Sequence, residues 1–126
     1  MKALWLLSFM AGSACASPLS DYQLHCMGCH GATGSGDVSR VPSANEAFRR
    51  FAATESGQDY LIRVPGIATS PLSDERLTAL LNWLLSESGG ANQGARVFSV
   101  KQVAEARLRP LADVKAARLR AMLTTP

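Results

Sequence analysis

The chain has 126 residues, a formal net charge of +3 and 47% hydrophobic residues. A chain of this length suits one folded domain. It carries no nucleophile paired with a base, no carboxylate pair in a recognisable setting and no phosphate-binding loop. The composition therefore gives no sign of a hydrolase or a phosphate-transfer enzyme, and the residues that carry chemistry must be sought in a shorter motif.

Residues 1–16 predict an export signal. A lysine at the second position is followed by apolar residues 3–11, and residues 14–16 read Ala-Cys-Ala, a typical cleavage site. The apolar run is far shorter than the ~20 residues that a membrane-spanning helix needs. We therefore expect cleavage near Ala16, a mature chain that begins at Ser17 in the periplasm, and no transmembrane segment in that mature chain.

Cys15 lies next to the expected cleavage site and suggests an alternative. A lipoprotein would carry an acyl group on this cysteine, but Gly12 occupies a position where a leucine-like residue is preferred. Cleavage would remove Cys15 and leave Cys26 and Cys29 as the cysteines of the mature chain.

Residues 26–30 read Cys-Met-Gly-Cys-His, the C-x-x-C-H pattern of c-type haem attachment. In this pattern the thiols of Cys26 and Cys29 add to the two haem vinyl groups, and His30 becomes the proximal axial ligand of the iron. Haem carries redox chemistry that side chains lack. We therefore expect one covalent haem c, and its attachment outside the inner membrane agrees with the export signal.

Three other interpretations of this motif fit the surrounding sequence less well. A thioredoxin-like redox pair would follow a strand in an alternating βα pattern, which is not visible here. A zinc site would draw on His25 and the motif residues, which are too compact in sequence for one tetrahedral site. A plain disulfide between Cys26 and Cys29 would leave His30 without a role.

The pattern along the chain predicts an all-α fold. The helix at Asp74–Glu87 is the clearest, because leucines recur on one face at three- and four-residue spacing and Ser73 precedes it as N-cap. A glycine-rich loop is expected at residues 31–36. The other expected helices are a short one opened by Ser20 that runs into the motif, residues 44–53 after Ser43, residues 58–64, residues 100–108 after Ser99, and a last one between Leu111 and Leu123.

Residues 19–88 resemble a class I cytochrome c. The motif lies at the end of a short first helix, residues 70–77 read Ser-Pro-Leu-Ser-Asp-Glu-Arg-Leu before the last helix, and residues 82–84 read Asn-Trp-Leu within it. The resemblance implies cytochrome c-like helices around one covalent haem. It divides the chain into a signal peptide at 1–16, a cytochrome c domain at 17–90 and a basic helical extension at 91–126.

The resemblance also implies two further contacts of the cofactor. The family places a proline about a dozen residues after the motif histidine, and here Pro42 lies twelve residues after His30. Its carbonyl would accept the Nδ1–H of His30, which fixes the ring and makes the ligand more basic. Trp83 would pack near Tyr22 and the 26–30 turn. The plainer alternatives are a loop proline and an ordinary core aromatic.

The expected distal ligand departs from the family. Class I cytochromes usually supply a methionine just before the last helix, but residues 31–121 contain neither methionine nor histidine. The iron is either five-coordinate or water-bound beneath residues 65–67, ligated by Met122 from a folded-back extension, or ligated by a partner protein. We favour the first. Weaker candidates from side-chain chemistry alone are Tyr60, Lys101 and Lys115.

Charge is distributed unevenly. Residues 17–90 carry five Arg and Lys against eight Asp and Glu, a net −3, whereas residues 91–126 carry seven against two, a net +5. In an exported haem protein the basic segment favours an acidic redox partner over nucleic acid, and a solvated helix face is the plain alternative. We expect Lys115, Arg118 and Arg120 to point outward from a helix that is either a lid or a docking arm.

The sequence thus predicts a periplasmic monohaem c-type cytochrome that passes single electrons between redox partners, such as a dehydrogenase or an oxidase. It fits a carrier or cytochrome subunit better than an enzyme on its own. The alternative is a haem protein whose open distal site binds small ligands, as a sensor or weak peroxidase. The lack of a distal base counts against efficient peroxidase chemistry. A third interpretation is a structural subunit in which the haem only stabilises a small core.

Overall fold

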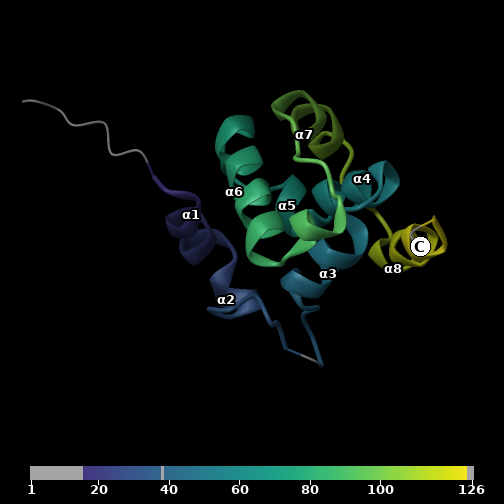
Figure 1. Cartoon of the computed structure of the whole chain (residues 1–126), viewed down its shortest axis with the longest axis horizontal. Coiled ribbons are helices and arrows are strands. Elements are labelled where there is room, and N and C mark those ends of the chain that lie inside the picture. Colours follow the sequence, from purple (N-terminus) through teal and green to yellow (C-terminus); the bar gives the residue numbers. More distant parts are fainter. Residues whose placement is uncertain (1–15, 38, 125–126) are drawn as a thin grey trace, which may run out of the picture.

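The computed structural model describes residues 16–37 and 39–124 (Figure 1). The regular structure of this part is helical, and its β-type pairing is limited to an isolated bridge between Asp37 and Val41. The expected all-α class is confirmed. The helices are α1 Pro18–His25, α2 Met27–His30, α3 Ala44–Phe51, α4 Glu55–Arg63, α5 Pro65–Ala68, α6 Asp74–Glu87, the 3₁₀ helix η1 Gly90–Gln93, α7 Val100–Arg107 and α8 Val114–Thr124.

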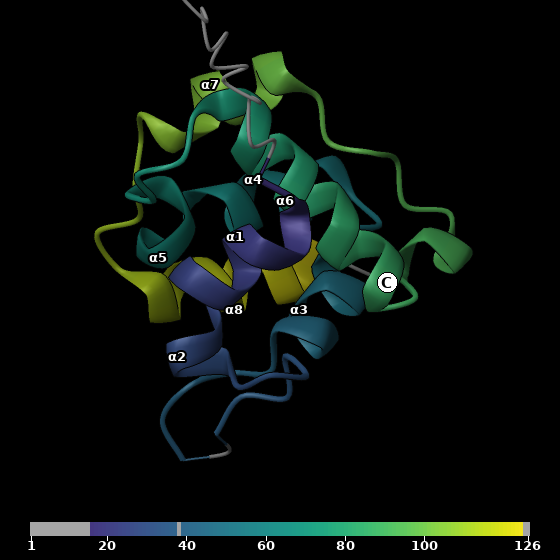
Figure 2. The same cartoon turned by 90° about the vertical axis from the view of Figure 1, so that its left-hand side faces the viewer.

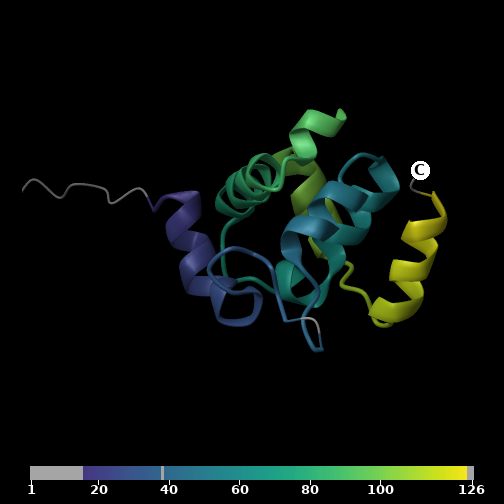
Figure 3. The same cartoon turned by 60° about the horizontal axis from the view of Figure 1, so that its bottom comes forward.

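The two ends of the molecule are formed by different parts of the chain. The N-terminal helices α1 and α2 lie toward one end of the long axis, and α8 lies at the other (Figure 1). The rotated view in Figure 3 shows the same separation. Helices α3, α4 and α6 lie between them, and α3 contacts both α4 and α6. Figure 2 looks onto α1, which packs against α6.

The hydrophobic core forms where α3, α4 and α6 meet. Phe51 of α3 and Ile62 of α4 are fully buried, and the Phe51 ring lies 4.9 Å from that of Tyr60 in an edge-to-face contact. The leucine face predicted for α6 is buried against these residues. The three- and four-residue spacing of the leucines therefore identified the buried face of this helix correctly. Its members are Leu77, Leu80, Leu81, Leu84 and Leu85.

Helix caps explain which predicted boundaries were right. Ser73 caps α6 as expected, and the helix spans the predicted residues. The prediction that Ser20 opens the first helix was wrong: Ser17 caps α1 by accepting a hydrogen bond from the Ser20 amide at 3.2 Å. The predicted start of the 58–64 helix was also wrong, because the Thr54 hydroxyl accepts from the Gly57 amide and begins α4 three residues earlier.

An aromatic contact and an ion pair lock the crossing of α1 and α6. The rings of Tyr22 and Trp83 lie 5.5 Å apart, so these two residues pack together as the family resemblance implies. Asp21 is only 1% exposed, and its carboxylate receives two hydrogen bonds from the Arg76 guanidinium, one of them from Nε at 3.3 Å. The buried charge is thereby paired, as a charge in a core must be.

The C-terminal extension packs onto the same core as the rest of the chain. Val103 and Ala117 are buried members of that core, from α7 and α8 respectively. The Leu111 amide donates to the Arg63 carbonyl at 2.9 Å and fixes the α7–α8 connection to α4. The proposed boundary at residue 90 stays a prediction. Most of the predicted signal peptide, residues 1–15, lies outside the described residues, and none of the described helices is long and apolar enough to cross a bilayer.

The Asp21–Arg76 pair gives a stability prediction. Arg76→Ala leaves the Asp21 carboxylate buried without its charged partner, so we expect the free energy of unfolding to fall by about 3 kcal/mol. Urea denaturation followed by circular dichroism measures this loss.

The matched control is Lys101→Ala. Lys101 lies 4.0 Å from Glu105 in an ion pair whose side chains are 85% and 67% exposed. Its removal should change the free energy of unfolding by less than about 0.5 kcal/mol. Equal losses from both substitutions would mean that the α1–α6 pair contributes no more than a surface pair.

Candidate functional site

The two motif thiols and the motif imidazole line one cavity. The Cys26 amide donates to the Tyr22 carbonyl at 2.9 Å at the end of α1, and the His30 amide donates to the Cys26 carbonyl at 3.0 Å. The short helix α2 formed in this way brings Cys26, Cys29 and His30 to the wall of a cavity of about 320 Å³. Much of the remaining wall is apolar and includes Phe48, Leu61, Val64, Ile67, Leu84 and Val114.

A hydrogen bond to Pro42 fixes the His30 ring. The Nδ1 atom of His30 lies 3.1 Å from the Pro42 carbonyl oxygen. A carbonyl can only accept, so Nδ1 carries a proton, and in the neutral ring the lone pair is then on Nε2. The imidazole is therefore set in the tautomer that can bind a metal ion through Nε2.

The glycine-rich loop positions Pro42 for this contact. The Gly36 amide donates to the His30 carbonyl at 2.9 Å, and Asp37 and Val41 exchange two backbone hydrogen bonds that turn the chain back. Gly36 has φ +70°, and a Cβ atom there would overlap the Val41 carbonyl oxygen. This position accordingly requires glycine.

Tyr22 ties the loop after the motif to the core. Its ring is 2% exposed, and its hydroxyl donates to the Gly31 carbonyl at 2.6 Å. Burial raises the pKa of this phenol, and the Cys26 thiol adds to the rise. The hydroxyl therefore stays a donor throughout the neutral range and holds Gly31 at the end of α2.

The motif cysteines are free thiols in this structure. Burial raises the pKa of Cys26, and the charges of Asp21 and Cys29 raise it further. Cys26 is consequently a protonated thiol at neutral pH. Within the described residues no three His, Cys, Asp or Glu side chains gather as a metal ion would require, so the zinc interpretation gains no support.

Helices α4, α5 and α8 also contribute to the cavity lining. Tyr60, Gly66 and Arg118 line the cavity together with apolar side chains. The lining residues of the described chain include no methionine, and the histidines among them are His25 and His30. Burial raises the pKa of the Tyr60 phenol, and the nearby Arg118 guanidinium opposes the rise.

The remaining sequence-predicted residues lie outside the cavity wall. Met122 is on α8 and packs against the core as a partly buried side chain, but it is not among the residues that line the cavity. Trp83 likewise packs on the core and on Tyr22 rather than lining the cavity. A distal ligand role for Met122 and a cofactor contact for Trp83 stay predictions.

Arg118 corrects one prediction about the extension. The sequence placed it on the outer face of the last helix with Lys115 and Arg120, and those two residues are exposed. Arg118 is half-buried and lines the cavity instead. The rest of the cavity lining comes largely from other helices, among them α4 with Tyr60, so no local pattern in α8 could have placed Arg118 there.

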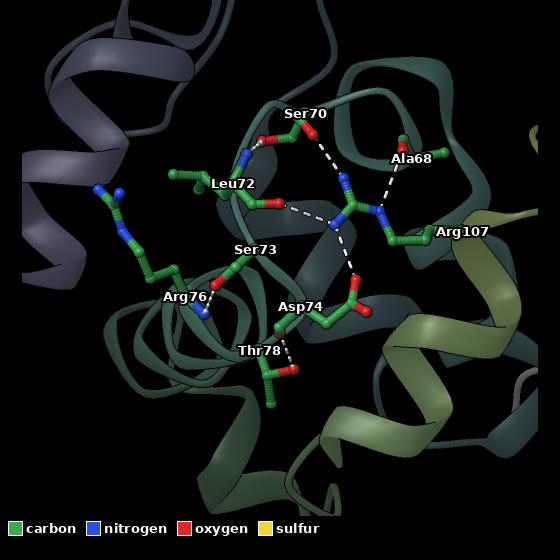
Figure 4. Close-up of polar contacts among 8 residues, drawn as sticks. All are labelled: Ala68, Ser70, Leu72, Ser73, Asp74, Arg76, Thr78 and Arg107. Atoms are coloured by element: carbon green, nitrogen blue, oxygen red, sulfur yellow. Dashed lines mark hydrogen bonds and ion pairs between the residues drawn. The ribbon is translucent and has the colours of Figure 1, made fainter.

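Arg107 was not anticipated, yet it holds the segment between α5 and α6 (Figure 4). Its guanidinium donates to the carbonyls of Ala68, Ser70 and Leu72 and to the Asp74 carboxylate, with distances of 2.9 Å to the last two. An arginine from the C-terminal part of the chain thus fixes the backbone between α5 and α6.

A second hollow, of about 510 Å³, lies apart from the motif between α4 and α7. Its lining is largely polar and includes Glu55, Arg109 and the weak ligand candidate Lys101, but neither the motif residues nor Pro42, Trp83 or Met122. The candidate cofactor-binding residues Cys26, Cys29, His30 and Pro42 therefore line the smaller, more apolar cavity.

Searches of protein-family models, curated proteins and solved structures found no match to this chain.

The conformation of Gly36 gives a prediction about the site. Gly36→Ala adds a Cβ in a left-handed backbone region and against the Val41 carbonyl, so we expect the protein to lose about 2–3 kcal/mol of stability. The His30–Pro42 hydrogen bond should loosen with it, because the same turn positions Pro42. Urea denaturation measures the first effect, and NMR of the His30 ring protons reports the second.

Gly28→Ala is the control for this substitution. Gly28 lies inside the same motif, but a Cβ there would have nothing within 4 Å and the backbone is helical. Its replacement should leave both measurements unchanged or raise stability slightly. A similar loss from both alanines would show that the turn at Gly36 is not what positions Pro42.

Proposed function

We propose that this chain is an exported c-type cytochrome that carries single electrons, with one haem attached through Cys26 and Cys29 and ligated by His30. The observation that carries the proposal is the convergence of two free thiols and an imidazole with a fixed Nδ1–H on one largely apolar cavity. The donor set fits haem c, which needs two thiols for its vinyl groups and one nitrogen for its iron. Bound haem would supply one-electron redox chemistry.

The protein residues have simple tasks under this proposal. The Pro42 carbonyl holds the His30 ring and makes its Nε2 more basic. Apolar side chains such as Phe48 and Leu84 keep water from the cavity, which limits the rearrangement of solvent during electron exchange. The fixed His30 ring and the apolar wall suit an electron carrier, because electron transfer needs no further catalytic side chain.

Exposed apolar side chains beside the motif support exchange with a redox partner. Leu24 is 74% exposed and Met27 is 37% exposed, and both flank Cys26 in the sequence. We propose that a periplasmic dehydrogenase or oxidase docks there, near the point where the cofactor would reach the surface. The basic extension would favour an acidic patch on that partner.

Covalent attachment is the first test of the proposal. Expression with a bacterial haem-attachment system should give one haem per chain that stays bound under denaturing conditions, as read by mass spectrometry and a pyridine haemochrome spectrum. The loaded protein should also undergo reversible one-electron reduction in an optical titration. Cys26→Ala combined with Cys29→Ala should abolish the covalent haem.

Cys15→Ala is the matched control, because this cysteine lies in the predicted signal peptide. The substitution should leave haem content unchanged. A chain that carries a Cys26–Cys29 disulfide or a zinc ion in place of haem, with unmodified motif cysteines, would refute the proposal.

The second candidate function is ligand binding at an open distal site. It is favoured by one observation: the cavity lining within the described residues offers His25 and His30 but no methionine. We expect the reduced, haem-loaded protein to bind carbon monoxide rapidly, with a clear spectral shift, while His30→Ala loses the proximal ligand and changes the spectrum before carbon monoxide is added. Met122→Leu is the control and should change neither result. Sharp low-spin bands that do not change when carbon monoxide is added would instead indicate that a protein side chain occupies the sixth coordination position of the iron.

A further inference from the structure

Two hydrogen-bond donors from outside the motif line the cavity. Tyr60 comes from α4 and Arg118 from α8, whereas His30 comes from α2, and α2 and α8 lie at opposite ends of the long axis (Figures 1 and 3). The Arg118 guanidinium is close enough to Tyr60 to act on the charge of its phenolate. The two side chains thus form a polar pair in a largely apolar wall.

Neither donor is used by the protein itself. Tyr60 is 8% exposed, yet its hydroxyl makes no hydrogen bond to any other described residue. Arg118 is half-buried and has no ion pair or hydrogen bond within the described part of the chain. No buried side-chain nitrogen or oxygen of the described residues lacks a partner, so the unbonded Tyr60 hydroxyl is accessible rather than sealed in the core. Because Tyr60 and Arg118 both line the cavity, a ligand inside it can accept hydrogen bonds from both.

Helix α8 is fixed in the position that presents Arg118. Its buried residues Ala117 and Ala121 face the core. The Thr124 hydroxyl lies 3.1 Å from that of Ser56 near the start of α4, so the C-terminal end of the helix is tied to the body. Arg118 and Val114 are one helical turn apart and both line the cavity.

The charge of the cavity specifies the kind of ligand. The charged side chains of its lining are Arg40 and Arg118, and no Asp or Glu lines it. An apolar wall strengthens the attraction of a cation for an anion because water screens it less. We propose that Arg118 and Tyr60 together bind a small anion inside the cavity, on the side away from His30.

This inference rests on the proposed haem function, because the anion would lie against the distal side of the cofactor. Arg118 would supply the charge and Tyr60 a neutral hydrogen bond, which suits a small monovalent anion such as azide or nitrite. The carboxylates of the haem itself are the other possible source of negative charge. The experiment must therefore separate a free anion from a haem carboxylate.

Azide titration of the oxidised, haem-loaded protein is the test, followed by the optical spectrum. We expect Arg118→Gln to weaken azide binding by about tenfold or more, the loss of one charge-assisted hydrogen bond. Tyr60→Phe should weaken it by roughly threefold, because a neutral hydrogen bond contributes less. Arg118→Lys should restore much of the affinity that Arg118→Gln removes, because lysine keeps the charge.

Two controls isolate the local effect. Arg120→Gln makes the same charge change on an exposed part of α8 and should leave the azide affinity within about twofold, because screening weakens distant charges. Imidazole, a neutral ligand of oxidised haem, should bind the wild-type chain and Arg118→Gln with similar affinity. Circular dichroism of each variant confirms that it is folded.

The outcomes separate the two proposals. A loaded protein that binds no azide, or equal losses from the Arg118 and Arg120 variants, would overturn the anion site and leave the carrier function standing. An unchanged azide affinity in Arg118→Gln, together with a shifted midpoint potential, would assign Arg118 to a haem carboxylate and also overturn it. A chain that takes up no haem would overturn the proposed function, and the anion site with it.

Discussion

The phenol of Tyr22 joins the hydrophobic core to the turn that carries the motif. Its ring is buried against Trp83, and its hydroxyl holds the Gly31 carbonyl directly after His30. This link adds to the connection through α1 and to the hydrogen bonds that tie His30 to Gly36 and Pro42. The neighbouring ion pair between Asp21 and Arg76 fixes the angle at which α1 crosses α6. The geometry of the cavity therefore depends on a few contacts at one helix crossing.

Much of the fold could be predicted because its signals are local. Leucine spacing and the Ser73 cap set α6 correctly, and the Ser99 capping box set the start of α7. The same signals failed where several hydroxyl residues competed for one cap. Ser17 rather than Ser20 begins α1, and Thr54 begins α4, because a cap depends on the backbone conformation before the helix as well as on the residue type.

In the candidate site, too, a contact near the motif was predicted, whereas the positions of distant residues were not. The hydrogen bond between His30 and Pro42 was implied by the family resemblance rather than derived from the residues alone, and the structure contains it. Arg107 and Arg118 reach across the fold from the extension to residues far away in the sequence. Such contacts leave no period and no fixed spacing, so the sequence suggested outward-facing charge at a position that in fact lines the cavity.

The loop before α6 is held in position by Arg107, a residue of the C-terminal extension. If this loop had a methionine bound to iron, that bond would fix its position, but here Arg107 fixes the adjacent carbonyls instead. Under the proposed function, this wall would stay in place even with the iron open on that side. Loss of a methionine ligand lowers the potential of a haem, whereas a nearby cation such as Arg118 favours the reduced, less positive state and raises it. Under the proposed function the two effects oppose each other, so a chain without the usual ligand can still exchange electrons with ordinary partners.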